Sequence, residues 1–289
     1  MNATKEKEAI ASHLKEGTQI ENEISITGKW VPRKPGGIFR KSPDSLEMLK
    51  EWKDIHQEAR NHKGMLSTEI NHAVGQDAVL VHHVFENSDA LISYFGNTAS
   101  NHAQALMAVA KPEIHMVRGV DISQEVIQEI NKREIPVVFA EYRYGYVKHD
   151  YRQPDPKHAI QVTAKWTSKT GADVNELDYW WQQVGKDAFD MEKGLIRFEV
   201  FKVVGEDALV IHETFDSSDE LKFHLTKGTA AKYKKEIDAI AAPENYFFRG
   251  PVSWTIRTYS KFMKLPATYS SRGSHYTIEG GNMSDGINK

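Results

Sequence analysis

Cysteine is absent from the 289 residues of this chain. Disulfides, thiolate nucleophiles and cysteine metal sites are therefore excluded. No apolar run reaches the length of about 20 residues that a helix needs to cross a bilayer. The charged N-terminal sequence MNATKEKEAIASHLKEG lacks the apolar core of a signal peptide. These absences predict a cytoplasmic protein.

An excess of charge of one sign is also missing. The formal net charge is −3, which gives no reason to expect nucleic acid or a membrane as a partner. The sequence contains no glycine-rich phosphate loop, no GxSxG elbow and no HExxH motif. His82 and His83 are adjacent, but neighbouring side chains of a strand point to opposite faces, which disfavours a shared metal ion. We expect neither a metal nor a cofactor.

An internal repeat dominates what is present. The segment 64–96, GMLSTEINHAVGQDAVLVHHVFENSDALISYFG, aligns with 194–226, GLIRFEVFKVVGEDALVIHETFDSSDELKFHLT. The two segments share eleven identities in 33 positions, where unrelated sequences would share about two. The chain length suits two domains, and the hydrophobic content of 40% is that of a globular protein.

The order of expected elements is the same in both halves. Strand, helix, hairpin, helix and strand follow one another, which is the βαββαβ order of ferredoxin-like folds, and each half then adds a helix and a strand. We predict an α+β protein made of two tandem ferredoxin-like repeats. The predicted parts are an N-terminal arm (1–19), a first repeat (20–150), a second repeat (151–276) and a flexible tail (277–289).

The strand 208–215 has no polar face, because apolar side chains occupy both sides of it. A half-exposed antiparallel strand would alternate apolar and polar residues. Both faces of the sheet therefore need cover. Helices can cover one face of each repeat, and the sheet of the other repeat can cover the second.

The second half resembles the antibiotic-biosynthesis-monooxygenase family, which belongs to the dimeric α+β barrel superfamily. Gly194, Glu213, Phe215, Asp219 and His224 match the family's pattern of hairpin, capped helix and helix histidine. The match is poorer in the first half, where His83 and Tyr94 stand in place of Glu213 and His224. The resemblance covers about 100 residues of each half and is stronger evidence of fold than of chemistry.

The resemblance implies that one chain forms the family's dimeric barrel, with the second strand of each repeat beside the fourth strand of the other. We therefore predict that Glu69 approaches Arg249 and that Glu199 approaches Arg118. Charge-assisted pairs of this kind fix register more than they add stability. The alternative is that all four side chains point to solvent.

Several residues could carry chemistry. His82 and His212 are the histidines found in both halves, and a buried neutral histidine can act as a general base; the alternative is a core histidine bonded to a neighbour. The difference between His83 and Glu213 predicts that one pocket kept a function that the other changed, unless the position simply drifted. His224 could reach a pocket mouth or be a solvated helix residue. The aromatic run 179–181 could line a ligand pocket but is more typical of core.

The resemblance implies a cofactor-independent monooxygenase that oxidises a small quinol or phenol. In that hypothesis His212 is the base, Glu213 orients the base or substrate, and Arg249 stabilises negative charge, with His82 and His224 as further candidates. Neighbouring strand positions make it difficult for His212 and Glu213 to serve one pocket. The alternative is a non-catalytic ligand-binding or assembly protein. An aromatic small molecule is the expected partner, and a further homodimer is an open alternative.

Overall fold

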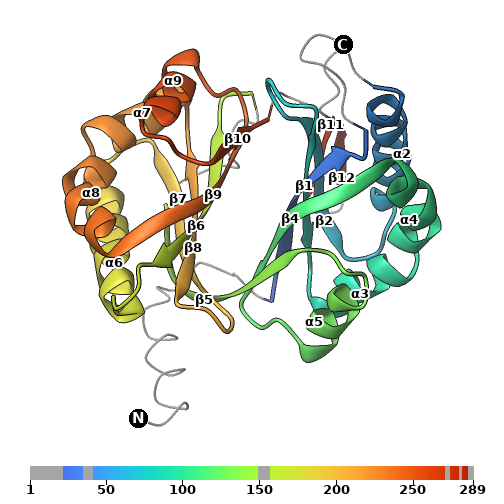
Figure 1. The fold of residues 1–289 in the computed structure, drawn as a ribbon, viewed down its shortest axis with the longest axis horizontal. Helices are drawn as coiled ribbons and strands as arrows, with labels where there is room; N and C mark the ends of the chain where they lie inside the picture. Colours follow the sequence, from blue (N-terminus) through green and yellow to red (C-terminus); the bar gives the residue numbers. More distant parts are fainter. Residues whose placement is uncertain (1–21, 35–41, 149–156, 271–273, 280–281, 286–289) are drawn as a thin grey trace. The chain divides into compact units, whose positions relative to one another are not determined.

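The computed structural model describes residues 22–34, 42–148, 157–270, 274–279 and 282–285. The predicted N-terminal arm lies outside these residues. Two compact units are found (Figure 1). We call Ile20–Glu141 with Ser270–Lys289 the N-terminal unit, and Tyr142–Tyr269 the C-terminal unit.

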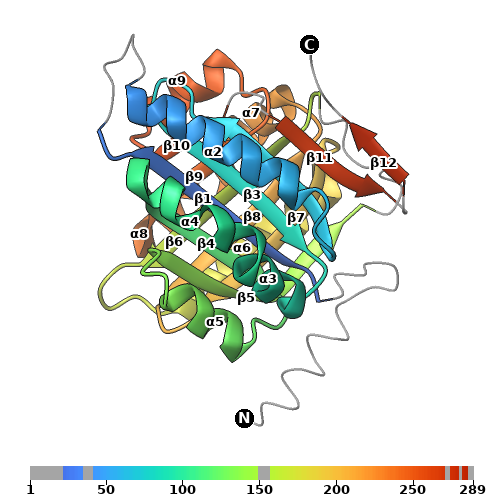
Figure 2. The ribbon, with the colours of Figure 1, turned by 90° about the vertical axis from the view of Figure 1, so that its right-hand side faces the viewer.

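The N-terminal unit contains a mixed sheet with helices on one face (Figure 2). The strand order is β5-β4-β1-β3-β2-β11-β12. The strands are β1 (Ile24–Pro32), β2 (Met65–His72), β3 (Val79–Phe85), β4 (Ala110–Gly119), the first part of β5 (Val137–Val147), β11 (Ser274–Glu279) and β12 (Asn282–Asp285). The helices are α2 (Pro43–Ala59), α3 (Ser88–Gly96), α4 (Thr98–Val109) and α5 (Gln124–Asn131).

The C-terminal unit has the corresponding order β10-β9-β6-β8-β7-β5, to which β5 contributes its residues from Tyr142 onward. Its other strands are β6 (Ile160–Ser168), β7 (Leu195–Val203), β8 (Ala208–Phe215), β9 (Ala241–Arg249) and β10 (Ala267–Tyr269). Its helices are α6 (Val174–Met191), α7 (Ser218–Thr226), α8 (Thr229–Ile240) and α9 (Trp254–Phe262). The chain is therefore a mixed α+β protein.

Local sequence explains where these elements begin and end. Ser42 caps α2 by accepting the backbone N–H of Ser45, and Pro43 takes the first helical position. Ser217 and Glu220 have the spacing of a capping box, and Ser217 caps α7 by accepting the backbone N–H of Glu220. Gly75 and Gly205 have positive φ angles of 71° and 78° in the two hairpin turns, a conformation that glycine adopts without steric cost.

The two units share details of packing as well as element order. Pairing of β1 with β4 shifts register between Lys29 and Trp30, and pairing of β6 with β9 shifts between Lys165 and Trp166. A β-bulge depends on the local sequence and strand pairing, so its recurrence at the same place in both units is a detailed similarity. In each core the bulge tryptophan meets a helix tryptophan edge-on: the ring centroids of Trp30 and Trp52 are 5.4 Å apart, and those of Trp166 and Trp181 are 5.3 Å apart.

Some details differ from the sequence predictions. The sequence predicts one helix from the cap at Ser217 to Pro243, but the structure has two helices, α7 and α8, which are separated near Gly228. Residues 277–279 and 282–285 of the predicted flexible tail belong to the strands β11 and β12, and β11 pairs antiparallel with β2. The edge strand of a sheet has unpaired backbone N–H and C=O groups, and β11 pairs with those of β2. Every residue of β8 is buried, in keeping with its two apolar faces. No helix in the described part of the chain is both long and apolar enough to cross a membrane.

Candidate active site

In the N-terminal unit, the sheet face that packs on the helices carries a polar cluster inside an aromatic core. We call His56 of α2, Thr68 of β2, His83 of β3 and His115 of β4 the histidine cluster. Thr68 Oγ1 lies 2.8 Å from His83 Nδ1 and 3.3 Å from His56 Nδ1. The single hydroxyl can donate to only one of these rings and must accept from the other. This contact fixes the orientation of the His83 ring.

His83 is the centre of the cluster and is 2% exposed. Its ring centroid lies 5.4 Å from that of Tyr94 and 6.3 Å from that of Trp52. Its Nε2 atom is buried and has no hydrogen-bond partner among the described residues. Burial lowers the pKa of His83 to about 3, and repulsion from His56 and His115 adds to the decrease. The ring is therefore neutral at physiological pH.

The His115 ring lies where a side chain on Gly28 would otherwise be. A Cβ atom on Gly28 would lie 2.1 Å from His115 Cδ2, so the ring packs directly over the glycine backbone. The ring also meets Trp30 edge-on, with centroids 5.5 Å apart. His115 Nδ1 is a second buried nitrogen without a partner among the described residues. Burial lowers the pKa of His115 to about 4.

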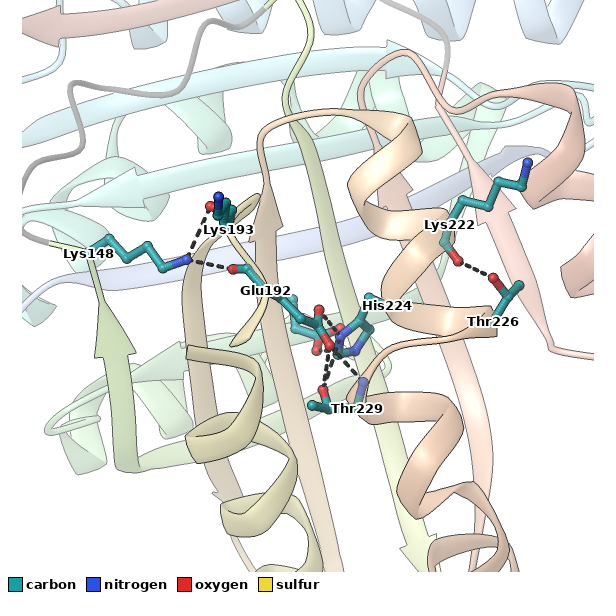
Figure 3. Close-up of polar contacts among 8 residues, drawn as sticks. Lys148, Glu192, Lys193, Lys222, His224, Thr226 and Thr229 are labelled. Carbon is teal, nitrogen blue, oxygen red and sulfur yellow. Dashed lines mark hydrogen bonds and ion pairs between the residues drawn. The ribbon is translucent and has the colours of Figure 1, made fainter. Parts of the chain in front are cut away.

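The C-terminal unit has charged side chains at the corresponding positions, where Glu213 and His224 align with His83 and Tyr94. Figure 3 shows His224 of α7 against the carboxylate of Glu192, which follows α6. His224 Nδ1 lies 2.8 Å from Glu192 Oε2, and His224 Nε2 lies 3.1 Å from Glu213 Oε1. Thr229 donates its backbone N–H (2.7 Å) and its hydroxyl (2.8 Å) to Glu192 Oε1. We call these four residues the Glu–His–Glu network.

Electrostatics make this network ionic. Burial alone lowers the pKa of His224, but Glu213 and Glu192 outweigh it and raise the pKa to about 10. Burial alone raises the pKa of Glu192, but the contacts with His224 and Thr229 outweigh it and lower the pKa. The ring is therefore a buried imidazolium whose two nitrogens both face carboxylates. It has no lone pair with which to accept a proton.

Comparison with solved structures shows the fold of the chain. A protein of Fusobacterium nucleatum, provisionally described as a monooxygenase, matches with a TM-score of 0.55 and 9% identity, over 92% of this chain and 99% of its own. The match must therefore include residues of both units. Two further structures match with lower TM-scores: a Lactobacillus acidophilus protein with the same provisional description (TM-score 0.48, 12% identity, 78% of this chain and 91% of its own covered) and an anthrone oxidase-like protein (0.48, 10%, 80% and 91%).

At the level of sequence, no protein-family model matches the chain, and no curated protein matches it either. The structural similarity thus establishes a monooxygenase-like α+β fold. The chemistry has to be inferred from the side chains of the site, because one fold can host many functions.

The structure brings together some of the residues that the sequence singled out. Glu213 and His224 are in contact through the Glu–His–Glu network. His224 is 1% exposed, so the alternative of a solvated helix residue is wrong. His212 turns to the other face of β8, where its Nδ1 lies 3.0 Å from Thr163 Oγ1. Arg249 shares that face and donates to the Gln161 side chain.

The second repeated histidine has the same surroundings as the first. His82 Nδ1 lies 2.8 Å from Thr27 Oγ1, which matches the contact between His212 and Thr163.

Of the aromatic run, Trp181 lies in the core, whereas Tyr179 is 52% exposed. Within the described residues, no group of three or more histidine, aspartate or glutamate side chains is arranged to hold a metal ion. His102 contacts two carboxylates, those of Glu51 (3.3 Å) and Glu58 (3.1 Å).

Sequence reasoning missed His56, Thr68, His115 and Glu192. His56 follows Trp52 by four residues and therefore shares its helix face, which is a usable pattern. Gly28 within an otherwise alternating strand also indicates a close approach by another group. Nothing in the sequence marks Glu192, because it lies in a turn and its partners come from two distant helices.

Proposed function

We propose that this protein is a cofactor-independent monooxygenase of small planar phenols or quinols, and that the histidine cluster of the N-terminal unit is its working site. The observation that carries the proposal is His83: a buried, neutral imidazole, oriented by Thr68, whose Nε2 has no partner among the described residues. Buried polar atoms are nearly always hydrogen-bonded, so an unpaired one indicates a place for a bound group.

The cluster suits a flat ligand with polar groups. His83 and His115 each present one unpaired ring nitrogen, and the rings of Trp30, Trp52 and Tyr94 surround them. The indole N–H groups of Trp30 and Trp52 are also without partners among the described residues, although those of Trp166 and Trp181 are too. The two imidazole nitrogens are therefore what distinguishes the N-terminal unit.

The proposed reaction consumes molecular oxygen. His83 Nε2 accepts the phenol proton, and the phenolate supplies electrons to O2, which bonds to the ring carbon para to the oxygen. Loss of that carbon's proton and cleavage of the O–O bond leave a second C=O group and one water, so that phenol plus O2 gives quinone plus water. Burial makes His83 a weak base, and attraction between the imidazolium and the phenolate formed beside it offsets part of that penalty.

His212 is the base in the hypothesis drawn from sequence, with Glu213, Arg249, His82 and His224 in supporting roles. We now favour His83, because the threonine contact of His212 recurs at His82 and indicates a framework role for both histidines. The His224 ring is charged and held between two carboxylates, which leaves it unable to act as a base.

Oxygen uptake tests the assignment. With anthrone and 1-naphthol as probes, each of which carries hydrogen on the carbon para to its oxygen, the native chain should consume one O2 per substrate and release no peroxide. His83→Ala should lower the rate by about 10²–10⁴-fold, whereas His212→Ala should keep most of the activity.

Two results would contradict the proposal in different ways. Activity lost in His212→Ala but kept in His83→Ala would return the base to the C-terminal unit. Probe binding without oxygen uptake in the native chain would favour the alternative of a non-catalytic binding protein.

We further infer that each unit is one ferredoxin-like repeat, that the chain arose by duplication, and that the repeats close the family's barrel in a cytoplasmic protein. Matching bulges and matching Thr–His contacts support the duplication. The pairs Glu69 with Arg249 and Glu199 with Arg118 stay predictions. Double-mutant cycles test them, since each pair should show coupling of about 0.5–3 kcal/mol only if its members touch.

A further inference from the structure

Large aromatic side chains are exposed on α7 and α9 of the C-terminal unit. Trp254 and Phe262, at the two ends of α9, are 72% and 81% exposed, and Phe223 of α7 is 43% exposed. The two helices lie side by side (Figure 1), and Tyr259 of α9 donates its hydroxyl to the carbonyl of Leu225 in α7 (3.0 Å). Ile256 and Ser260 are buried, so the opposite face of α9 is anchored in its unit.

The N-terminal unit shows that these aromatic residues are not needed for the fold. At the positions 130 residues earlier, Phe223, Trp254 and Phe262 are replaced by Ser93, Gln124 and Lys132. The equivalent helix α5 is formed there with polar residues on its outer face. Exposed apolar side chains that packing does not require indicate a surface that meets something else.

Charge differs between the same two segments. Residues 254–264 contain Arg257, Lys261 and Lys264 and no acidic residue, which gives +3. Residues 124–134 contain two basic and three acidic residues, which gives 2 − 3 = −1. The surface formed by Phe223 and residues 254–264, here called the α9 surface, is thus both aromatic and basic, although the whole chain carries −3.

We propose that the α9 surface docks on the surface of an anionic lipid bilayer. Helices that lie in the membrane interface combine tryptophan or phenylalanine on one side with lysine and arginine beside them. Trp254, Thr258 and Phe262 follow i, i+4, i+8 spacing and form one stripe along α9. The aromatic rings enter the headgroup region, and the cations attract the acidic lipids.

A second copy of the chain fits this surface less well. A two-fold symmetric contact would bring the same patch of each copy together. Arg257, Lys261 and Lys264 would then face their own counterparts, and repulsion between like charges opposes such a pairing. The proposal is independent of the oxygenase assignment, because it concerns residues outside the histidine cluster.

Vesicle co-sedimentation tests the proposal with the full chain. The native protein should partition onto vesicles of phosphatidylcholine mixed with phosphatidylglycerol and much less onto phosphatidylcholine alone. Trp254→Ala with Phe262→Ala should lower the partition coefficient by about tenfold or more, because two large apolar side chains no longer enter the interface. Lys261→Glu with Lys264→Glu should abolish the preference for the acidic lipid, and added salt should weaken native binding.

The N-terminal unit supplies the matched control. Gln124→Ala with Lys132→Ala changes the equivalent helix and should leave vesicle binding unchanged, as should Tyr179→Ala, which removes an exposed aromatic elsewhere. Circular dichroism of each variant checks that the fold is intact. The proposal is overturned if the native chain does not bind the mixed vesicles, if it binds both vesicle types equally, or if the aromatic variant binds as well as the native chain. Self-association that the aromatic variant abolishes, without vesicle binding, would assign the surface to a second copy instead.

Discussion

The N-terminal and C-terminal units have the same arrangement of strands and helices, but the buried polar groups between sheet and helices are neutral in one unit and charged in the other. Both place a histidine against a threonine of the neighbouring strand, and both pack a bulge tryptophan on a helix tryptophan. At the helix-facing positions, however, the N-terminal unit has His83 and Tyr94, whereas the C-terminal unit has Glu213 and His224. The first pair is uncharged at neutral pH, and the second belongs to an ionic network.

This difference separates residues that hold the fold from residues that are free to carry chemistry. Contacts found in both units are explained by the framework that the units share. Among the described residues, the histidine cluster is found in the N-terminal unit alone and the Glu–His–Glu network in the C-terminal unit alone, so the shared framework does not require either. In the Glu–His–Glu network each charge faces an opposite charge, whereas His83 is a neutral imidazole whose Nε2 has no hydrogen-bond partner among the described residues.

The largest expected effect comes from removing the buried cation. His224→Gln leaves Glu192 and Glu213 buried without their positive partner, and we expect a loss of about 3–5 kcal/mol in the free energy of unfolding. The matched change in the N-terminal unit, Tyr94→Phe, removes only a neutral hydroxyl and should cost less than about 1.5 kcal/mol. Urea unfolding measures both, and equal losses would contradict the assignment of the two sites as ionic and neutral.

The two units should also respond to pH in opposite directions. The pKa values of His83 (about 3) and His115 (about 4) lie below the value of about 6.5 for an unfolded histidine. The unfolded state therefore binds more protons, and the N-terminal unit loses stability as pH falls below about 6.5. His224 has a raised pKa of about 10, so its contribution is fully present below about 6.5 and is lost as pH rises through about 10.

Hydrogen exchange, read by mass spectrometry and corrected for intrinsic rates, can follow β3 and β8 separately across this range. Protection of β3 should decrease on the acid side, and protection of β8 on the alkaline side. His224→Gln is the control, because it should remove the alkaline dependence of β8. Parallel changes in the two strands would show that the difference in charge between the units is wrong.

A smaller effect concerns the space beneath His115. Gly28→Ala places a methyl group where the imidazole now lies, and we expect a loss of about 1–3 kcal/mol in stability. The C-terminal unit already has Ala164 opposite Tyr246, so Ala164→Gly should have no comparable steric effect. Thermal unfolding compares the two variants, and a neutral Gly28→Ala would mean that His115 can leave its place freely.

The smallest effects should be equal in the two units. Thr27→Val and Thr163→Val each remove the hydroxyl that contacts a strand histidine at 2.8 Å and 3.0 Å. Each should cost about 1 kcal/mol in the free energy of unfolding, and neither should alter oxygen uptake. A loss of activity in Thr163→Val alone would revive His212 as the base.

Much of the fold could be predicted because periodicity and capping act locally. The alternating pattern from Ile24 to Trp30 predicts β1, and Ser42 followed by Pro43 predicts the start of α2. The separation of α7 from α8 was missed because Lys227 and Gly228 interrupt a helical pattern without a strong stop. The pairing of β11 with β2 depends on an available strand edge, which no local pattern of residues 274–279 reveals.

The candidate site was predictable only in part. Comparison of the halves singled out His83, Glu213, Tyr94 and His224 as the positions that differ. The partners Thr68, His115 and Glu192 come from other strands and turns, and their contribution depends on distances between side chains. The overall charge of −3 also hid the basic α9 surface, because a sum over the chain says nothing about where the charges lie.

The sequence by itself determined the repeated order of strands and helices and the burial of β8 on both faces. These properties follow from hydrophobic spacing and turn residues, which act over a few neighbours along the chain. Only the tertiary structure decided which polar side chains meet: that Thr68 holds His83, that two carboxylates enclose His224, and that Trp254 and Phe262 remain exposed. Charge state and exposure depend on all groups within a few ångströms in space, and chain order does not encode those neighbours directly.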